Sequence, residues 1–291
     1  MNGVCTMEPR TAIVTGASRG IGQYIARALA GRGMSLLLVA RSEGELVRFA
    51  RELRSPDVKV AVAAVDLGGP DAAGQVADAA QAELGAVDVL VNNAAIEPQI
   101  RFHILSPAEI DYVLRVDLAT PLLLSRLLLP GMLDRGYGRI VNISSLAGHV
   151  SFPYTETYAA AKDGLNAFSR VLRSDYRSAG VTATSLILGA VKDVGFGART
   201  LAETGLTANT SFAAKPEKVA AATLRAIDKG KAEIVVNPGP GRLLKALMDY
   251  SPGMGPMINR LTGADRLMAT VAEHRETARA RMIAEESARI V

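Results

Sequence analysis

A tyrosine and a lysine four positions apart are the residues best suited to move a proton. Tyr158 and Lys162 lie near the start of a helical pattern that spans residues 158–179. Residues four apart on a helix share a face, so the ammonium group should lie beside the phenol. A free phenol has a pKa of about 10 and is a poor base at neutral pH. A neighbouring positive charge favours the phenolate and lowers that pKa. The pair is therefore predicted to exchange a proton with a substrate near physiological pH.

A glycine-rich turn near the start of the chain has the form of a phosphate cradle. Residues 15–22 read TGASRGIG, between a predicted strand at 12–15 and a predicted helix at 21–30. Glycines at such a turn let the backbone approach a pyrophosphate closely, and the helix start offers free N–H groups to the anion. We therefore expect a dinucleotide here. The residues expected to line the cradle are Gly16, Ser18, Arg19, Gly20, Ile21 and Gly22.

The end of the second predicted strand bears on which dinucleotide is bound. A carboxylate at this place would accept hydrogen bonds from the adenosine ribose and favour NAD(H). The chain instead has Arg41 followed by Ser42, and Arg19 lies in the glycine-rich turn. Two guanidinium groups can pair with a 2′-phosphate, so the sequence favours NADP(H) over NAD(H). The alternative is that both arginines are only solvated.

These residues belong to a regular alternation of strands and helices. Apolar runs predict strands at 12–15, 35–40, 58–65, 87–92, 139–144, 181–187 and 233–236. Helical patterns lie between them, at 21–30, 43–53, 71–84, 107–135, 158–179 and 216–229. Continuous apolar strands joined by helices predict a buried parallel sheet. Right-handed crossovers then give an α/β, doubly wound sheet with helices on both faces.

We expect residues 1–237 to form a single catalytic domain and residues 238–291 to form a helical tail. Within the domain, residues 190–214 read as a loop with a short helix. The tail holds a Pro/Gly/Met segment at 250–257 and then a charged amphipathic helix at 264–287. Its apolar stripe predicts packing on the same domain or on a partner subunit, with a membrane surface as the alternative.

From about residue 11 to residue 191, the chain resembles the short-chain dehydrogenase/reductase family, which has a Rossmann-type fold. The matching motifs are the glycine-rich turn, Asp66-Leu67, Asn92-Asn93-Ala94-Ala95, Asn142-Ile143-Ser144-Ser145 and Tyr158-Ala159-Ala160-Ala161-Lys162. The resemblance implies that Tyr158 protonates a carbonyl oxygen during reduction and accepts the alcohol proton during oxidation. It also implies that Lys162 holds the nicotinamide ribose. Ser145, thirteen positions before the tyrosine, would orient the substrate oxygen.

The same resemblance implies the remaining cofactor contacts and exposes three departures. The implied cofactor contacts are Asp66, Leu67, Asn92, Ala94, Gly189 and Val191. Asp117 stands where the family usually has asparagine. Leu188 and Asp193 replace the family's usual proline and threonine beside the nicotinamide. An ionised Asp117 accepts hydrogen bonds but cannot donate them. Two roles are open for it: it holds a water near Lys162, or it pairs with Lys162 directly.

Charge, cysteine and histidine content, and hydropathy argue against several other kinds of partner and site. The net charge is only +4 over 291 residues, without a basic stripe, so we expect no nucleic-acid partner. Cys5 is the single cysteine, and the three histidines lack metal-ligand spacing, so no disulfide or metal site is expected. The sequence shows no signal peptide and no apolar run of spanning length, which predicts no transmembrane segment and a cytoplasmic location.

The sequence therefore predicts an enzyme, an NADP(H)-dependent oxidoreductase that interconverts a carbonyl and an alcohol on a small, hydrophobic molecule. Apolar residues of the 190–214 lid (Phe196, Leu201, Leu206, Phe212) and of 146–154 (Leu146, Val150, Phe152, Pro153, Tyr154) are expected to line its pocket, or else to be core. The rival hypothesis is a catalytically weakened, cofactor-binding regulatory or scaffold protein. An epimerase or dehydratase is less favoured, because no sugar-nucleotide domain is evident. The resemblance implies a homodimer or homotetramer, paired through residues 122–129 and 168–171.

Overall fold

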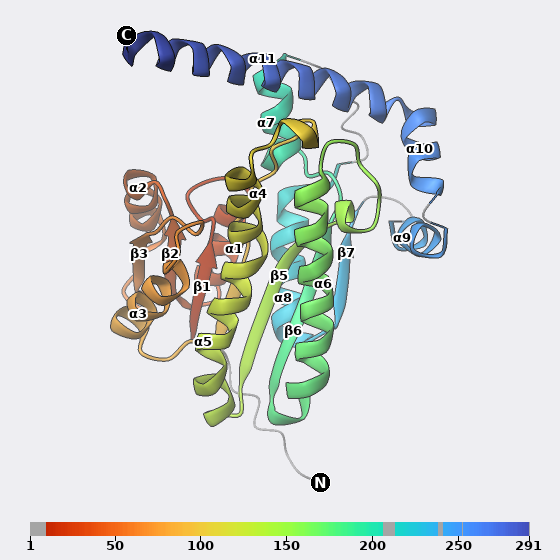
Figure 1. Cartoon of the computed structure of the whole chain (residues 1–291). Coiled ribbons are helices and arrows are strands. Elements are labelled where there is room, and N and C mark those ends of the chain that lie inside the picture. The colour runs from red at the N-terminus through yellow and green to blue at the C-terminus, as the bar shows by residue number, and fades with distance from the viewer. Residues whose placement is uncertain (1–9, 206–212, 238–240, 252, 291) are drawn as a thin grey trace.

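The computed structural model describes residues 10–205, 213–237, 241–251 and 253–290, and these contain one seven-stranded parallel sheet of order β3-β2-β1-β4-β5-β6-β7 (Figure 1). Its strands are β1 (Thr11–Thr15), β2 (Ser35–Ala40), β3 (Val60–Ala64), β4 (Val89–Asn92), β5 (Gly138–Ser145), β6 (Val181–Leu188) and β7 (Glu233–Val236). The strand order reverses between β1 and β4, and in sheets of this kind ligands bind at that reversal, outside the carboxyl ends of the strands. Cys5, Leu206 and Phe212 lie outside the described residues.

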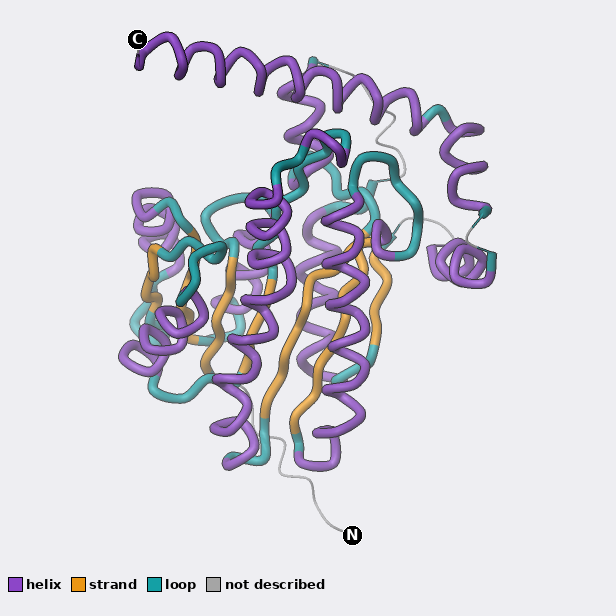
Figure 2. The backbone as a smooth tube through the Cα atoms, in the orientation of Figure 1, coloured by secondary structure: helices purple, strands orange, loops and turns teal. Residues whose placement is uncertain are grey.

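Helices cover both faces of the sheet, as predicted (Figure 2). In chain order they are α1 (Ile21–Ala30), α2 (Glu43–Leu53), α3 (Ala72–Leu84), α4 (Pro107–Leu114), α5 (Thr120–Asp134), α6 (Glu156–Tyr176), α7 (Gly195–Thr204), α8 (Pro216–Lys229), α9 (Gly241–Tyr250), α10 (Met254–Thr262) and α11 (Ala264–Ile290). One core contains Ile25, Phe49 and Val219 from α1, α2 and α8. The other contains Val76 and Leu124 from α3 and α5. The strands are apolar on both sides because each side faces a helical layer.

The helix predicted at 107–135 is continuous but contains a change of winding. After α4, a π-helical turn runs from Arg115 to Ala119, and α5 follows it. A π turn inserts one residue into the helical repeat and is often found at functional sites. Here the turn contains Asp117, whose side chain is fully buried.

By length and composition, residues 107–134 are also apolar enough to cross a membrane, since an 18-residue window within them has a mean hydropathy of 1.4. In the fold, 44% of that window is buried, and the inner side of α5 packs on the sheet through Leu124, Leu129 and Met132. That packing explains the apolar composition, since the same residues form the core.

The short helix predicted within 190–214 is α7, ten residues long. Another segment contains more helix than the sequence predicts. The expected Pro/Gly/Met segment at 250–257 is divided between the end of α9 and the start of α10. Met248 of α9 is buried against Leu146 and Val150, so tertiary packing stabilises a helix that its local composition does not favour.

Candidate active site

The carboxyl end of β5 and the first turn of α6 bring three polar side chains together. Ser145 is the last residue of β5, and its hydroxyl lies within hydrogen-bonding reach of the Tyr158 hydroxyl. The Lys162 Nζ lies 5.4 Å from the centre of the Tyr158 ring. Tyr158 and Lys162 are 7% and 2% exposed, respectively. The structure thus assembles a hydroxyl, a phenol and an ammonium group in one buried place.

Asp117 joins this group through a direct ion pair. Its Oδ2 lies 3.3 Å from the Lys162 Nζ, and its Oδ1 accepts a 2.7 Å hydrogen bond from the Ile96 N–H. Lys162 also donates to the carbonyl oxygen of Ile143, at 3.2 Å. Burial raises the pKa of Asp117 to about 6, against the opposing effects of Lys162 and the Ile96 N–H. Of the two roles considered for Asp117, the structure therefore contains the ion pair.

The expected lowering of the Tyr158 pKa by Lys162 is wrong for this structure. Burial raises the pKa of Tyr158 well above 10, the negative charges of Glu97 and Asp117 raise it further, and only the hydrogen bond with Ser145 lowers it. The main physical reason is burial, which disfavours the charged phenolate, and the carboxylates of Glu97 and Asp117 act in the same direction. Tyr158 therefore rests as a protonated phenol, which is the form that donates a proton.

The glycine-rich turn has a backbone that strongly favours glycine. Gly16 and Gly20 have φ angles of 66° and 63°, in the left-handed region. A Cβ on Gly22 would lie 2.3 Å from the Gly16 carbonyl oxygen. The first turn of α1 contains no acidic residue, so its N–H groups remain available to an anion. This cradle fits the pyrophosphate of a dinucleotide.

Asn93 braces the cradle, a role that sequence reasoning missed. Its Nδ2 donates to the carbonyl oxygens of Thr15 and Gly16, at 2.9 and 3.2 Å. The Thr15 hydroxyl accepts hydrogen bonds from the N–H groups of Asn93 and Ala94. The available signal was position, because Asn93 directly follows β4, the strand beside β1.

Comparison with known proteins identifies this architecture. Residues 10–205 match the family model described as short chain dehydrogenase. The chain belongs to this family. It is 33% identical to the ketoacyl reductase HetN of a Nostoc species, over 93% of this chain and 95% of that protein. It is 34% identical to the very-long-chain 3-oxoacyl-CoA reductase of Anas platyrhynchos, over 60% of this chain and 58% of that protein. A solved metagenomic short-chain oxidoreductase in complex with NADP aligns with a TM-score of 0.67 and 31% identity, over 79% of this chain and 97% of that one. The protein is thus a short-chain dehydrogenase/reductase, an oxidoreductase acting on CH–OH groups and their carbonyl counterparts.

In this short-chain dehydrogenase, the residues at the end of β2 lie at the surface. Arg19 and Arg41 are both exposed, and Arg41 donates a 3.1 Å hydrogen bond to the Tyr112 hydroxyl. Tyr112 donates in turn to the Asp66 carboxylate, at 2.8 and 3.0 Å. Ser42 is the residue before α2. Arg41 and Asp66 are therefore linked through Tyr112, which the sequence did not single out.

The remaining candidate cofactor contacts, Asn92, Leu67 and Ala94, lie on segments that follow β3 and β4 or end β4. The side chain of Asn92 points into the sheet, where it donates to Asn142 at 2.8 Å. Leu67 is buried, and its carbonyl oxygen accepts from Thr120. Ala94 faces the turn, since a Cβ on Gly16 would lie 2.8 Å from its Cα.

The segment after β6 continues alongside β7. The Gly189 N–H donates to the Val236 carbonyl oxygen at 3.1 Å, and Val191 forms an isolated parallel bridge with Ala214. Leu188, at the place of the family's usual proline, is the buried last residue of β6, and Asp193 has a φ angle of 60°.

Of the two groups of apolar residues expected to line the substrate pocket, one contacts Tyr158 and the other is partly buried in the core. Phe196 of α7 packs edge-on against the Tyr158 ring, with the ring centres 5.8 Å apart, so the helix of the candidate lid contacts the candidate proton donor. Leu146 and Val150, candidates for the opposite wall, are instead buried with Met248 of α9. These two residues are core, because α9 covers the side that a substrate would otherwise contact.

Proposed function

We propose that this oxidoreductase uses NADPH to reduce the keto group of a hydrophobic acyl compound, of the 3-oxoacyl type. The observation that carries the proposal is the buried, protonated Tyr158 beside Ser145 and Lys162. A phenol held in its neutral form is suited to donate a proton to a carbonyl oxygen, which is what reduction requires. The names of the ketoacyl and 3-oxoacyl-CoA reductases that the chain resembles support the substrate class.

In this mechanism, the substrate carbonyl oxygen accepts hydrogen bonds from the hydroxyl groups of Ser145 and Tyr158. A bound nicotinamide supplies the hydride to the carbonyl carbon. The Tyr158 hydroxyl transfers its proton to the oxygen, giving the alcohol and a transient phenolate. Lys162 stabilises that phenolate by its charge, and Asp117 limits this stabilisation. Tyr158 then recovers a proton from solvent.

The preference for NADPH is part of the proposal and rests on two guanidinium groups. Arg19 in the glycine-rich turn and Arg41 after β2 are exposed on the segments that would flank the adenosine ribose. A guanidinium group pairs well with a phosphate through charge-assisted hydrogen bonds. Neither arginine is in an ion pair shorter than 4 Å with a carboxylate of the described residues, so both are available to a phosphate.

The test is NADPH oxidation, followed by absorbance, with 3-oxoacyl thioesters of increasing chain length and with small ketones for comparison. Tyr158→Phe should lower turnover by about 10²–10⁴-fold, the usual contribution of a positioned proton donor. Tyr176→Phe, at the far end of the same helix, is the matched control and should retain activity. Full turnover in Tyr158→Phe would contradict the mechanism. Tight NADPH binding without turnover on any carbonyl would favour the regulatory alternative.

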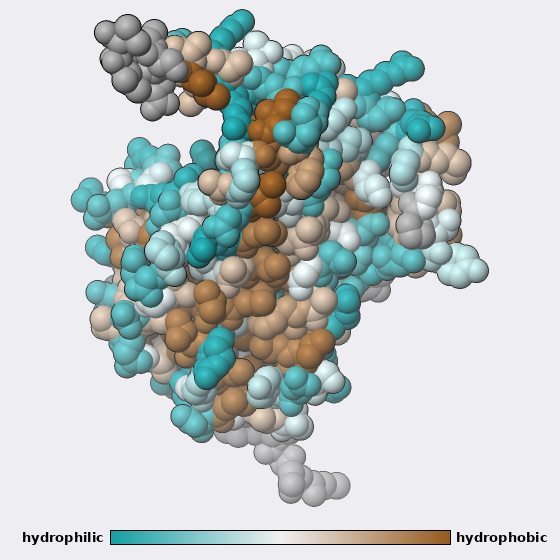
Figure 3. Space-filling view, viewed as in Figure 1, coloured by the Kyte–Doolittle hydropathy of each residue, from teal (hydrophilic) through white to brown (hydrophobic). Residues whose placement is uncertain are grey.

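We also propose that the protein is a homo-oligomer paired through α5 and α6. Leu123, Leu127 and Val171 are 53%, 49% and 61% exposed, although they are large and apolar. An apolar band follows α5 in the space-filling view (Figure 3). Light scattering after size-exclusion chromatography should give a dimer or tetramer, and Leu127→Glu should shift it toward the monomer.

We further propose a cytoplasmic location, which cell fractionation tests. The presence of a single cysteine among 291 residues supports this location.

A further inference from the structure

The long helix α11 lies outside the residues that match the family model, yet it contacts two segments that border the candidate active site. The family match ends at residue 205, whereas α11 spans Ala264–Ile290. The helix runs across the carboxyl end of the sheet, over α7 and the loop that follows β4 (Figure 1). One side chain in the middle of this helix, Arg275, joins these two segments.

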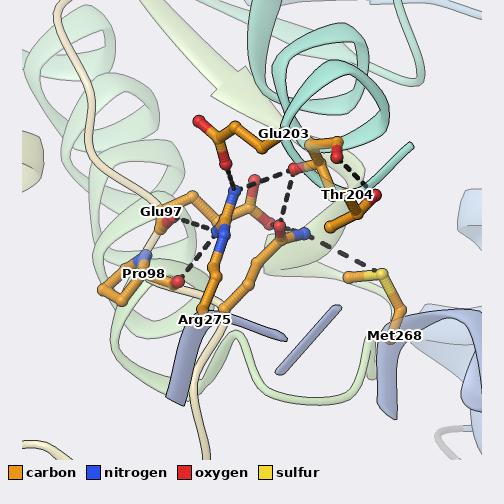
Figure 4. Close-up of polar contacts among 8 residues, drawn as sticks. Glu97, Pro98, Glu203, Thr204, Met268 and Arg275 are labelled. Carbon is orange, nitrogen blue, oxygen red and sulfur yellow. Dashed lines mark hydrogen bonds and ion pairs between the residues drawn. The ribbon is translucent and has the colours of Figure 1, made fainter. Parts of the chain in front are cut away.

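The Arg275 guanidinium binds four acceptors (Figure 4). Its Nη1 donates to the carbonyl oxygens of Glu97 and Pro98, at 3.2 and 2.8 Å. Its Nη2 donates to the Thr200 hydroxyl at 2.9 Å and to the Glu203 carboxylate at 3.0 Å. The first two acceptors belong to the loop after β4, and the last two belong to α7. A single side chain, 18% exposed, therefore ties the lid helix to that loop.

The same loop has a strained backbone at Gln99. Its φ angle is 50°, a conformation that non-glycine residues adopt at a cost and keep only when their surroundings enforce it. The Gln99 side chain is buried, accepts a 2.9 Å hydrogen bond from Thr200, and donates to Glu97 at 3.3 Å. Because Thr200 also binds Arg275, the strained loop and the lid are held by one hydrogen-bond network.

Both segments joined by Arg275 also contact the catalytic group. The loop after β4 contains Ile96, whose N–H donates to Asp117. The lid helix α7 contains Phe196, which packs on the Tyr158 ring. A displacement of either segment would therefore be felt at the residues that move the proton.

Further ion pairs keep α11 in place on either side of this contact. Arg101 pairs with Glu276 and, at 3.1 Å, with Glu273. Arg279 pairs at 2.8 Å with Glu109, the third residue of α4 and the partner of Ser106 in its capping box. The helix is thus attached to the catalytic body over more than one turn.

We propose that Arg275 is a positioning residue, and that α11 acts through it as a clasp that holds the lid helix α7 over the substrate site. The clasp pre-orders the two walls beside Tyr158, so a substrate meets a formed site instead of ordering one on binding. The effect on turnover rests on the proposed reductase function. The effect on the lid itself does not.

The first measurement is amide hydrogen exchange of the whole protein without substrate. Arg275→Ala should speed exchange in α7 and in residues 96–101 by at least about tenfold, the effect of losing even one of its four charge-assisted hydrogen bonds. Arg281→Ala, an exposed arginine on the same helix, is the matched control and should leave both segments unchanged. This readout needs no activity, so it separates failure of the clasp from failure of the proposed function.

The second measurement is the split between KM and kcat. Arg275→Ala should raise the KM for the carbonyl substrate by about tenfold and change kcat much less, because the proton-transfer residues are untouched. If Arg275→Ala does not fold, Thr200→Val removes the lid's hydroxyl with little change of shape, and it should show the same two effects. Unchanged exchange of α7 in the folded variant would overturn the proposal, as would a loss confined to kcat.

Discussion

Replacing Asp117 by asparagine tests how the buried ion pair controls the proton donor. Asparagine keeps the shape and an oxygen that can accept the Ile96 N–H, but it removes the negative charge 3.3 Å from the Lys162 Nζ. Asp117 raises the pKa of Tyr158 in the native protein, so its neutralisation must lower that pKa. The uncompensated ammonium of Lys162 then acts on the phenolate alone.

The magnitude follows from the distance between the charges. The Lys162 Nζ lies 5.4 Å from the centre of the Tyr158 ring, which gives about 3 kcal/mol at an effective dielectric constant of about 20. Since one pKa unit is about 1.4 kcal/mol, the full charge of Lys162 is equivalent to about 2 units. Asp117 cancels part of this effect in the native protein. We therefore expect Asp117→Asn to lower the pKa of Tyr158, by less than the equivalent of the about 3 kcal/mol that the unopposed charge of Lys162 would supply.

The assay is the pH dependence of kcat/KM in both directions of the reaction. Reduction needs the protonated phenol, so its alkaline limb should move to lower pH in Asp117→Asn. Oxidation needs the phenolate, so it should become active at lower pH than in the native enzyme. Asp111→Asn, on the exposed side of α4, is the control and should leave both profiles in place. An alkaline limb that stays fixed or moves upward would refute this account of the pair.

Three further outcomes are expected from the same structure. Arg41→Asp should lower the preference for NADPH over NADH by at least about tenfold in steady-state kinetics with each cofactor, because a carboxylate repels a 2′-phosphate; an unchanged ratio would show that Arg41 does not contact it. Gly22→Ala should abolish NADPH binding measured by calorimetry and lower the Tm, since its Cβ would lie 2.3 Å from a backbone oxygen, whereas Gly44→Ala, with open space around it, should do neither. Burial raises the pKa of Glu97 from 4.5 to about 7, so the native protein should lose stability relative to Glu97→Gln as pH rises across that interval. Urea unfolding of both proteins at about pH 5 and about pH 8 measures this difference. If the free energy of unfolding of the native protein instead rose with pH relative to that of Glu97→Gln, the prediction would be wrong.

The sequence predicts the sheet and most of its helices because these elements follow from local patterns. Continuous apolar runs mark strands buried on both faces, and the helices at 21–30, 43–53 and 216–229 begin and end where turn residues require. The π turn at Asp117 could not be predicted from the sequence, since one inserted residue barely changes the apolar repeat of a long helix. The helical tail was underestimated because α9 is stabilised by Met248 packing on distant residues, not by its composition.

For the site, the motifs identified which residues converge but not their charge state. The pKa of Tyr158 depends on burial and on Asp117 and Glu97, which lie 41 and 61 positions earlier in the chain. Likewise, the contacts of Arg275 with residues near position 97 join parts of the chain that no local pattern relates. Interactions between residues so far apart in the chain are determined by the tertiary fold and leave no local sequence pattern.

The position of α11 at the end of the element order also determines when it is synthesised. Every strand of the sheet precedes residue 264, so the ribosome delivers the complete sheet before this helix. Synthesis proceeds from the N-terminus at about 5–20 residues per second. The segments that form the nucleotide cradle are thus synthesised before α11, and under our proposal the lid helix α7 is clasped in place only after α11 has been made.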